Sequence, residues 1–258
     1  MELLLSMILA HVIADFLLQS PRIAEEKCQG LPRGYLLHFA GHLITLALLT
    51  HPFFSPALVI LWLILPAAHL LVDWLKNRLF SPTHPADALI FLLDQTLHLL
   101  LIFCTWQWTG PPLCEPVVSF YQRLLTPAGR SIVQYLFQDI APGSLLLIAT
   151  VYGYVIFGGA VLVRKVLDLE ALRLTDSAGS SAGNTRQAGR YIGMLERALL
   201  LTFTLASAFT SIAFVLTAKS IARYKELEDR DFAEYYLAGT LLSTLLAILG
   251  GLLLKSLL

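Results

Sequence analysis

Long apolar segments recur along the chain and constrain its fold more than any other feature. A helix needs about 20 mostly apolar residues to cross a bilayer. Of the 258 residues, 57% are hydrophobic and 14% are charged, and the mean hydropathy is +0.71, which excludes an ordinary soluble domain. The sequence therefore predicts an all-α, polytopic transmembrane bundle of about seven spans. These are residues 3–19, 35–50, 57–75, 88–108, 144–163, 199–217 and 236–254.

Proline and turn residues separate these segments and divide the chain into three parts. Residues 1–110 hold the first four spans, which we expect to form a bundle. Residues 111–142 include an amphipathic stretch, 117–137, which we expect to lie at the membrane interface. Residues 143–258 hold the remaining helices, with a Gly/Ser/Ala-rich stretch at 175–189 that predicts a flexible connector.

The distribution of charge predicts a partial topology. Arg22, Lys27 and Arg33 follow the first span, Lys76 and Arg78 follow the third, and the loop between the second and third has neither Lys nor Arg. The positive-inside rule then places the N-terminus outside, although the later basic loops do not fit seven spans. Over the whole chain, 18 Lys and Arg balance 18 Asp and Glu, so the sequence predicts no nucleic-acid partner.

Each of the first four spans carries two polar side chains four residues apart, which places both on one helix face. An ionisable side chain at the bilayer centre costs on the order of 3 kcal/mol. Groups of this kind must therefore face one another, water or an ion, and we expect them to line a shared interior. The pairs are His11 and Asp15, His38 and His42, His69 and Asp73, and Asp94 and His98.

Five imidazoles, three carboxylates and no thiolate favour a divalent metal, with Zn, Mn and Fe all compatible. These ligands exceed one tetrahedral site, so one or two ions are expected. Gln19 and Gln95 are predicted to orient ligands rather than to bind the ion. Lys76 either neutralises Asp73, holds an anionic substrate, or extends to the interface as a lysine at a span end. A buried proton or ion relay is the competing interpretation of the whole set.

A second, weaker set of basic residues flanks the predicted sixth span. It is either a ring of interfacial charges, which we favour, or an anion-binding platform for lipid headgroups. Its members are Arg190, Arg197, Lys219 and Arg223.

Four stretches within about the first 105 residues resemble a bacterial integral-membrane family, catalogued as domain of unknown function 3307. They read AHVIADFLLQ, LLHFAGH, AHLLVDWLK and LLDQTLHLL. The stretches GRYIGMLER, AKSIARY and EYYLAGTLLS are similar to those of its longer members. The resemblance implies a multi-pass protein of the bacterial cytoplasmic (inner) membrane and implies no activity. The histidine-rich spans are also loosely similar to membrane-bound metal-dependent hydrolases.

Two functions fit the predicted site. An intramembrane hydrolase would use the metal to activate water, with Asp15 or Asp94 taking the proton. Lys76 would then hold the headgroup of a lipid-linked or amphipathic substrate in the bilayer. Alternatively, a metal-ion or proton-coupled transporter would place the same residues near the middle of the membrane. Neither the substrate nor the oligomeric state follows from the sequence.

Overall fold

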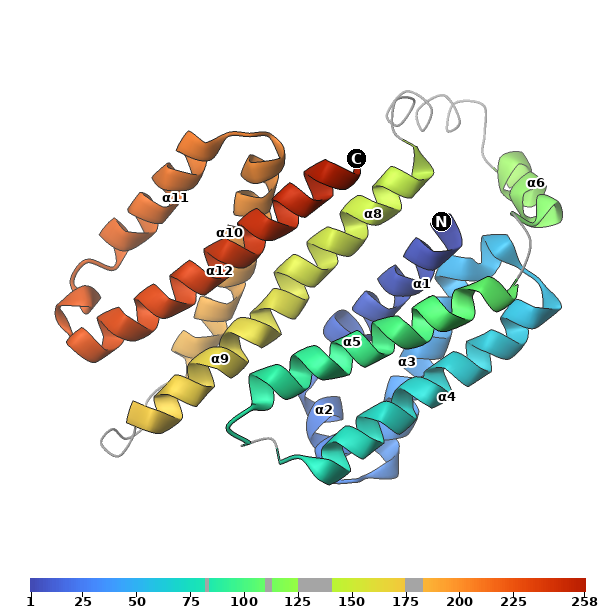
Figure 1. The fold of residues 1–258 in the computed structure, drawn as a ribbon, viewed down its shortest axis with the longest axis horizontal. Coiled ribbons are helices and arrows are strands. Elements are labelled where there is room, and N and C mark those ends of the chain that lie inside the picture. The colour runs from blue at the N-terminus through green and yellow to red at the C-terminus, as the bar shows by residue number, and fades with distance from the viewer. Residues whose placement is uncertain (82–83, 110–112, 125–140, 175–182) are drawn as a thin grey trace. The chain divides into compact units, whose positions relative to one another are not determined.

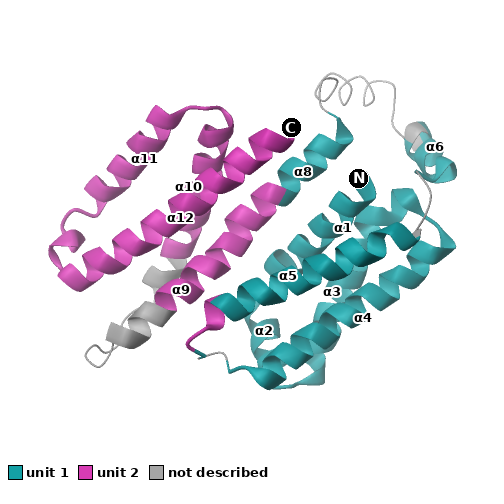
Figure 2. Cartoon of the chain, in the orientation of Figure 1, with its two compact units in different colours: residues 1–84, 89–150 teal, residues 85–88, 151–258 magenta. Residues whose placement is uncertain are grey.

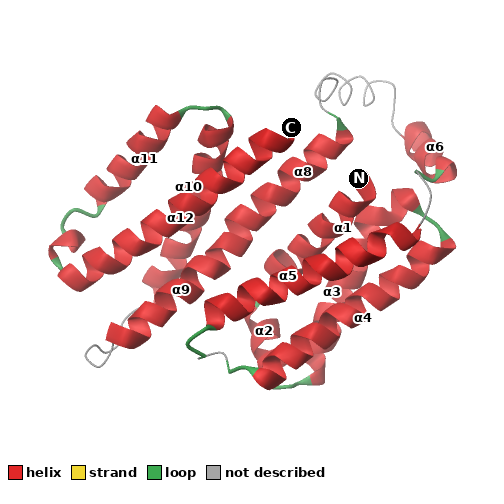
Figure 3. Ribbon diagram, in the orientation of Figure 1, coloured by secondary structure: helices red, strands yellow, loops and turns green. Residues whose placement is uncertain are grey.

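A computed structural model describes residues 1–81, 84–109, 113–124, 141–174 and 183–258, and every regular element among them is helical (Figures 1 and 3). The predicted all-α fold is thereby confirmed. The chain divides into two compact units (Figure 2). The first comprises residues 1–84 and 89–150, and the second comprises residues 85–88 and 151–258.

The first unit begins with α1 (Glu2–Val12), which continues directly into the π-helical η1 (Ile13–Leu18). A bend of 91° separates this helix from the short α2 (Pro21–Cys28). The longer helices follow as α3 (Pro32–Thr50), α4 (Pro56–Leu79) and α5 (Asp87–Thr105). The other elements among the described residues of this unit are the short turns η2 (His51–Phe53) and η3 (Trp106–Thr109), then α6 (Glu115–Leu124) and the start of α8 (Pro142–Gly153).

The second unit continues α8 through the π-helical η4 (Tyr154–Gly158) into α9 (Gly159–Leu174). It then contains α10 (Gly183–Leu205), α11 (Phe209–Ala222), the turn η5 (Glu226–Glu228) and α12 (Arg230–Leu257). Gly250 and Gly251 of α12 permit a close approach of its neighbours, because a Cβ at Gly251 would lie 2.7 Å from Thr204 Cβ.

Within the described residues, five helices are long and apolar enough to cross a membrane, and the bent pair α1/η1 and α2 adds a sixth if it counts as one span. Their length and composition indicate a membrane protein. The expected count of seven is not reached, because predicted span 199–217 is not one helix. It is interrupted between α10 and α11, where Ser207 adopts a φ of 58° and the Ala208 N–H donates to the Phe203 carbonyl (2.8 Å). The left-handed residue ends α10, as in a Schellman-type cap.

The two remaining predictions about connecting segments fall partly outside the described residues. Of the amphipathic stretch 117–137, residues 117–124 belong to α6, and 125–137 lie outside. Of the expected flexible connector 175–189, residues 183–189 are helical as the first turns of α10, which corrects that part of the prediction. Residues 175–182 lie outside the described part of the chain.

The interior of the first unit is apolar in one part of the bundle and polar in the adjoining part. One part is packed by apolar side chains of α1, α3, α4 and α5, and the adjoining part contains the predicted histidines and aspartates. The apolar cluster comprises Leu3, Leu4, Met7, Ala10, Leu46, Leu58, Leu61, Leu65 and Ile102. The polar groups are thus enclosed by a well-packed apolar region on the side of Met7 and Leu65.

Helix α2 folds back beside this polar region. Ser20 caps it by accepting a hydrogen bond from the Ile23 N–H (3.3 Å), and Pro21 occupies the first helical position, where its missing N–H costs nothing. The N-terminal end of α3 packs closely against it at Gly34. A Cβ at this position would lie 2.8 Å from both the Glu26 Cβ and the Lys27 backbone nitrogen, so only glycine permits the contact.

Candidate metal centre

All eight paired residues converge in the interior of the first unit. Seven of them are buried, and the side chain of Asp15 is 10% exposed. Asp15 lies in the π-helical turn η1, a type of helix irregularity that is frequent at functional sites. The predicted four-residue spacing thus places each pair toward the same interior, as expected from helical geometry.

Asp15 lies at the centre of the imidazoles. Its Oδ1 is 2.8 Å from His42 Nε2, 3.3 Å from His69 Nε2 and 3.4 Å from His38 Nε2. The Nε2 atoms of His38 and His69 are themselves 3.1 Å apart. We call these four residues, Asp15, His38, His42 and His69, the histidine centre.

The spacing within the histidine centre is that of metal ligands. Around a tetrahedral zinc ion with ligand distances of roughly 2.0–2.1 Å, neighbouring ligand atoms lie about 3.3 Å apart. The four distances above span 2.8–3.4 Å. Three imidazole nitrogens also crowd one carboxylate oxygen, which has only about two lone pairs to offer as a hydrogen-bond acceptor. An ion bound among them would satisfy all four groups at once.

Gln95 supports the other oxygen of Asp15. Its Nε2 donates to Asp15 Oδ2 (3.0 Å), and its Oε1 lies 3.3 Å from His11 Nε2. Gln95 thus contacts two of the predicted ligands, and its role in orienting them stays a prediction. The second predicted glutamine, Gln19, instead accepts a hydrogen bond from Lys27 Nζ (2.6 Å).

A second cluster, of lysines and aspartates, adjoins the histidine centre. Lys76 Nζ donates to Asp73 Oδ1 (2.8 Å) and Asp94 Oδ2 (2.9 Å), and Lys27 Nζ pairs with Asp73 Oδ2. The two carboxylates and two ammonium groups balance in charge. Of the roles predicted for Lys76, the structure therefore contains the contact with Asp73. We call Lys27, Asp73, Lys76 and Asp94 the lysine–aspartate cluster.

Lys27 is the site residue that sequence reasoning missed. The charge distribution assigned it to a cytoplasmic loop, whereas its side chain is 5% exposed and contacts Asp73. The available signal was Ser20-Pro21, a cap residue followed by proline, which begins a helix. A short helix at this point carries Lys27 back into the bundle.

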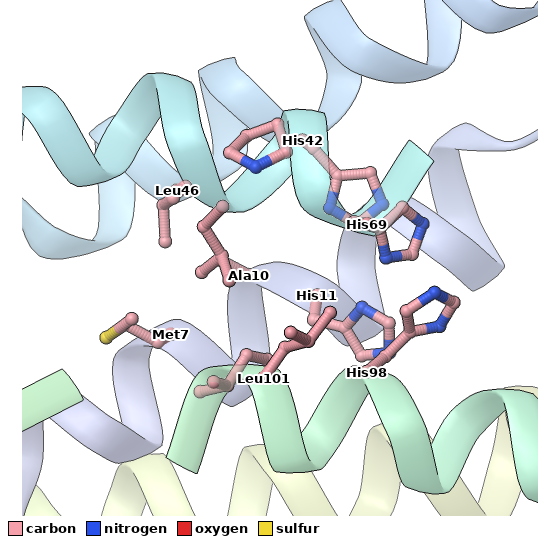
Figure 4. Close-up of a pocket in the computed structure, with 11 residues that line it drawn as sticks. Met7, Ala10, His11, His42, Leu46, His69, His98 and Leu101 are labelled. Atoms are coloured by element: carbon pink, nitrogen blue, oxygen red, sulfur yellow. The ribbon is translucent and has the colours of Figure 1, made fainter. Parts of the chain in front are cut away.

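A small cavity borders the imidazoles on the apolar side. Its volume is about 20 Å³, and Figure 4 shows the rings of His11, His42, His69 and His98 along it, with Met7, Ala10, Leu46 and Leu101 opposite. A cavity needs roughly 10–15 Å³ to hold one water molecule. The space beside the imidazoles therefore fits one water or one ion and no larger molecule.

Most residues of the second predicted basic set, Arg190, Arg197, Lys219 and Arg223, already have partners in the structure. Arg197 is buried and donates to the Ile156 carbonyl (2.9 Å) and to Ser243 Oγ (3.1 Å). Lys219 pairs with Glu196 (2.7 Å), Arg223 pairs with Glu226 (2.9 Å), and Arg190 is exposed. Three of these four cations already have partners, so the arrangement offers no assembled anion platform.

Comparisons with known proteins relate the N-terminal part of the chain to a family. Residues 3–123 match the family model described as "Protein of unknown function (DUF3307)", which confirms the resemblance carried by the four motifs. Neither the curated proteins nor the solved structures contain a match, so the looser likeness to membrane-bound hydrolases gains no support. The matched segment includes every residue of the histidine centre and of the lysine–aspartate cluster. Residues 3–123, just under half of the chain, are therefore similar to the DUF3307 family of proteins of unknown function.

Proposed function

We propose that the N-terminal bundle binds a divalent metal ion at the histidine centre and transports it across the bacterial cytoplasmic membrane. The observation that carries the proposal is the spacing of the ligand atoms: three imidazole nitrogens lie 2.8–3.4 Å from Asp15 Oδ1, and those of His38 and His69 lie 3.1 Å apart. Three nitrogen ligands and one oxygen, without thiolate, suit Zn best, and Mn and Fe remain compatible.

Transport is favoured over catalysis because the site is closed and has the size of an ion. The imidazoles of the histidine centre are at most 8% exposed, and the adjoining cavity holds about one water molecule. Lys76, the residue suggested for an anionic headgroup, is already paired with two carboxylates. A closed ion site inside a helix bundle corresponds to one state of a transporter.

The broken first helix gives the second argument for transport. Transporter sites typically lie where a helix is interrupted inside the membrane. Here α1/η1 ends at Leu18, bends by 91° and continues as α2, whose Lys27 contacts the lysine–aspartate cluster. The site thus adjoins a helix break, although no glycine or proline interrupts the residues 2–18 themselves.

Protons are the natural exchange partner for the ion. Imidazoles bind metal in their neutral form, so metal binding and protonation compete at the same nitrogens. A proton gradient would then drive release of the metal on the more acidic side.

Proteoliposomes containing the purified protein test the proposal. With a metal-sensitive dye inside and a pH gradient imposed, we expect Zn²⁺ uptake that His42→Gln abolishes. His51→Gln is the matched control, because His51 lies at a helix end and pairs with the Leu48 carbonyl and Tyr121 rather than with the centre. Bound metal without flux in any gradient direction would overturn transport.

A metal-dependent intramembrane hydrolase is the second candidate, and the water-sized cavity beside four imidazoles favours it. Zn would lower the pKa of a bound water to about 7. Asp15 or Asp94 would accept the proton, and a lipid-linked or amphipathic substrate would have to enter through an opened bundle. Chelator-sensitive release of headgroups or acyl chains from bacterial lipid extract, without metal flux, would select this function.

A further inference from the structure

Three buried groups beyond the histidine centre have polar atoms that face each other. Asp73, Asp94 and His98 are each at most 5% exposed, and one potential ligand atom from each lies within 4.8 Å of the others. Among the described residues, Asp94 Oδ1 and both ring nitrogens of His98 have no hydrogen-bond partner. Buried polar atoms rarely remain unpaired, so these three atoms indicate a missing ligand.

Without Lys27, the charges of this group would favour a cation as the ligand. The carboxylates of Asp73 and Asp94 lie close enough for Lys76 to contact both. Lys76 alone leaves this carboxylate pair with one uncompensated negative charge. That charge is neutralised by Lys27, whose ammonium contacts Asp73 Oδ2. Removal of Lys27 would expose a negative site lined by unpaired oxygen and nitrogen ligands.

The two lysines differ in how they are held. Lys76 belongs to α4, the helix that also carries Asp73, and lies only one turn away. Lys27 reaches the cluster from α2, an eight-residue helix that is separated from η1 by a 91° bend. A movement of α2 would therefore withdraw Lys27 and leave Lys76 in place.

We propose that Asp73, Asp94 and His98 form a second site for a divalent cation, which the Lys27 ammonium neutralises in the closed protein. The role of this site in transport rests on the proposed function, whereas the existence of the site does not. Asp73 Oδ2 lies 3.5 Å from His38 Nε2 and 3.6 Å from His69 Nε2. An ion that displaces Lys27 from Asp73 is thus already beside the histidine centre. The positive charge of Lys76 remains at the site and weakens the binding of the ion. Weak binding suits a site that an ion occupies only briefly during transport.

Metal stoichiometry tests this site directly. Purified wild-type protein and Lys27→Met are equilibrated with Zn²⁺ and analysed for protein-bound metal. We expect about one equivalent in the wild type and about two in Lys27→Met, because a carboxylate freed of its lysine attracts a metal ion. Lys27→Arg keeps the charge and should bind as the wild type does. Lys225→Met is the matched control, since Lys225 is exposed.

The double variant Lys27→Met/Asp94→Asn should lose the additional equivalent. Equal stoichiometry in wild type and Lys27→Met would overturn the second site while leaving the histidine centre intact. No bound metal in the wild type and one equivalent in Lys27→Met would support the second site and overturn the metal centre of the proposed function. No metal in either protein would overturn both.

A measurement on the wild type covers the case in which Lys27→Met does not fold. A membrane-permeable amine reagent is applied with and without Zn²⁺, and labelling of Lys27 is followed by mass spectrometry. The proposal requires Zn²⁺ in large excess over the amount that fills the histidine centre to raise Lys27 labelling several-fold, because the ion then competes with the ammonium for Asp73. Labelling of Lys225 should not change. Lys27 labelling that is independent of Zn²⁺ would overturn the proposal.

Discussion

Buried charges of the first unit face other charges, whereas the buried arginine of the second unit faces neutral groups. In the first unit, Lys27 and Lys76 contact Asp73, and three imidazoles surround Asp15. In the second, Arg197 donates to the carbonyl of Ile156 in the π-helical η4 and to Ser243. A π-helical turn disturbs the regular backbone hydrogen bonds, and inside a membrane its carbonyls need another donor.

The difference separates a structural polar group from a functional one. Arg197 satisfies a backbone carbonyl and needs no further ligand. The first unit contains crowded ligand atoms and buried atoms without partners among the described residues, such as Asp94 Oδ1. Such an arrangement is costly without an ion. Four predictions test whether ion binding is confined to the first unit.

The largest effect is expected at Asp15, which contacts all three imidazoles of the histidine centre. Asp15→Asn keeps the size of the side chain and removes its charge. Changes to groups that only orient metal ligands already cost about 10–100-fold in affinity, so we expect a loss of more than about 100-fold here. Competition with a metal-sensitive dye measures the affinity. Asp231→Asn, at the exposed start of α12, is the control. Full metal binding by Asp15→Asn would contradict the view that the first unit binds the ion through the histidine centre.

A smaller effect is expected at Gln95, which orients Asp15 without belonging to the centre. Gln95→Leu removes the donor to Asp15 Oδ2 and the contact with His11. Metal affinity should fall by about 10–100-fold, as for other orienting groups. The same dye competition measures it, with the exposed Gln107→Leu as control. An unchanged affinity would show that the position of Asp15 does not depend on Gln95.

Packing in the second unit should affect stability without affecting metal. At Gly251 an added Cβ would lie 2.7 Å from Thr204 Cβ, whereas at Gly41 the nearest atom is 3.8 Å away. Overpacking costs about 1–3 kcal/mol, and replacing helical glycine by alanine otherwise gains about 1 kcal/mol. Gly251→Ala should therefore unfold at a lower temperature than the wild type, and Gly41→Ala at the same or a higher one. A loss of bound metal in Gly251→Ala would mean that the units are coupled.

The sequence predicted the paired polar residues well because their signal is local. Side chains four residues apart share a helix face, and four apolar spans leave only the bundle interior for them. Lys27 could not be placed in the same way, since its position depends on the bend before α2 and on the close packing at Gly34. The division of predicted span 199–217 was also missed. Neither glycine nor proline marks it, and the left-handed residue is a serine.

The smallest effect is expected at that serine. A left-handed conformation costs a non-glycine residue roughly 1–2 kcal/mol, so Ser207→Gly relieves strain. Glycine loses about 0.5–1 kcal/mol more in backbone entropy on folding. The variant also lacks the hydroxyl that accepts a hydrogen bond from Lys255, an exposed contact worth about 0.5–1.5 kcal/mol.

These contributions nearly cancel, and the unfolding temperature of Ser207→Gly should stay close to that of the wild type. Ser207→Val is the informative partner, because a β-branched residue with positive φ is a genuine outlier and the variant also loses the hydroxyl. It should unfold at a clearly lower temperature, with unchanged metal binding. Equal stability of the glycine and valine variants would mean that the break between α10 and α11 does not depend on the conformation of residue 207.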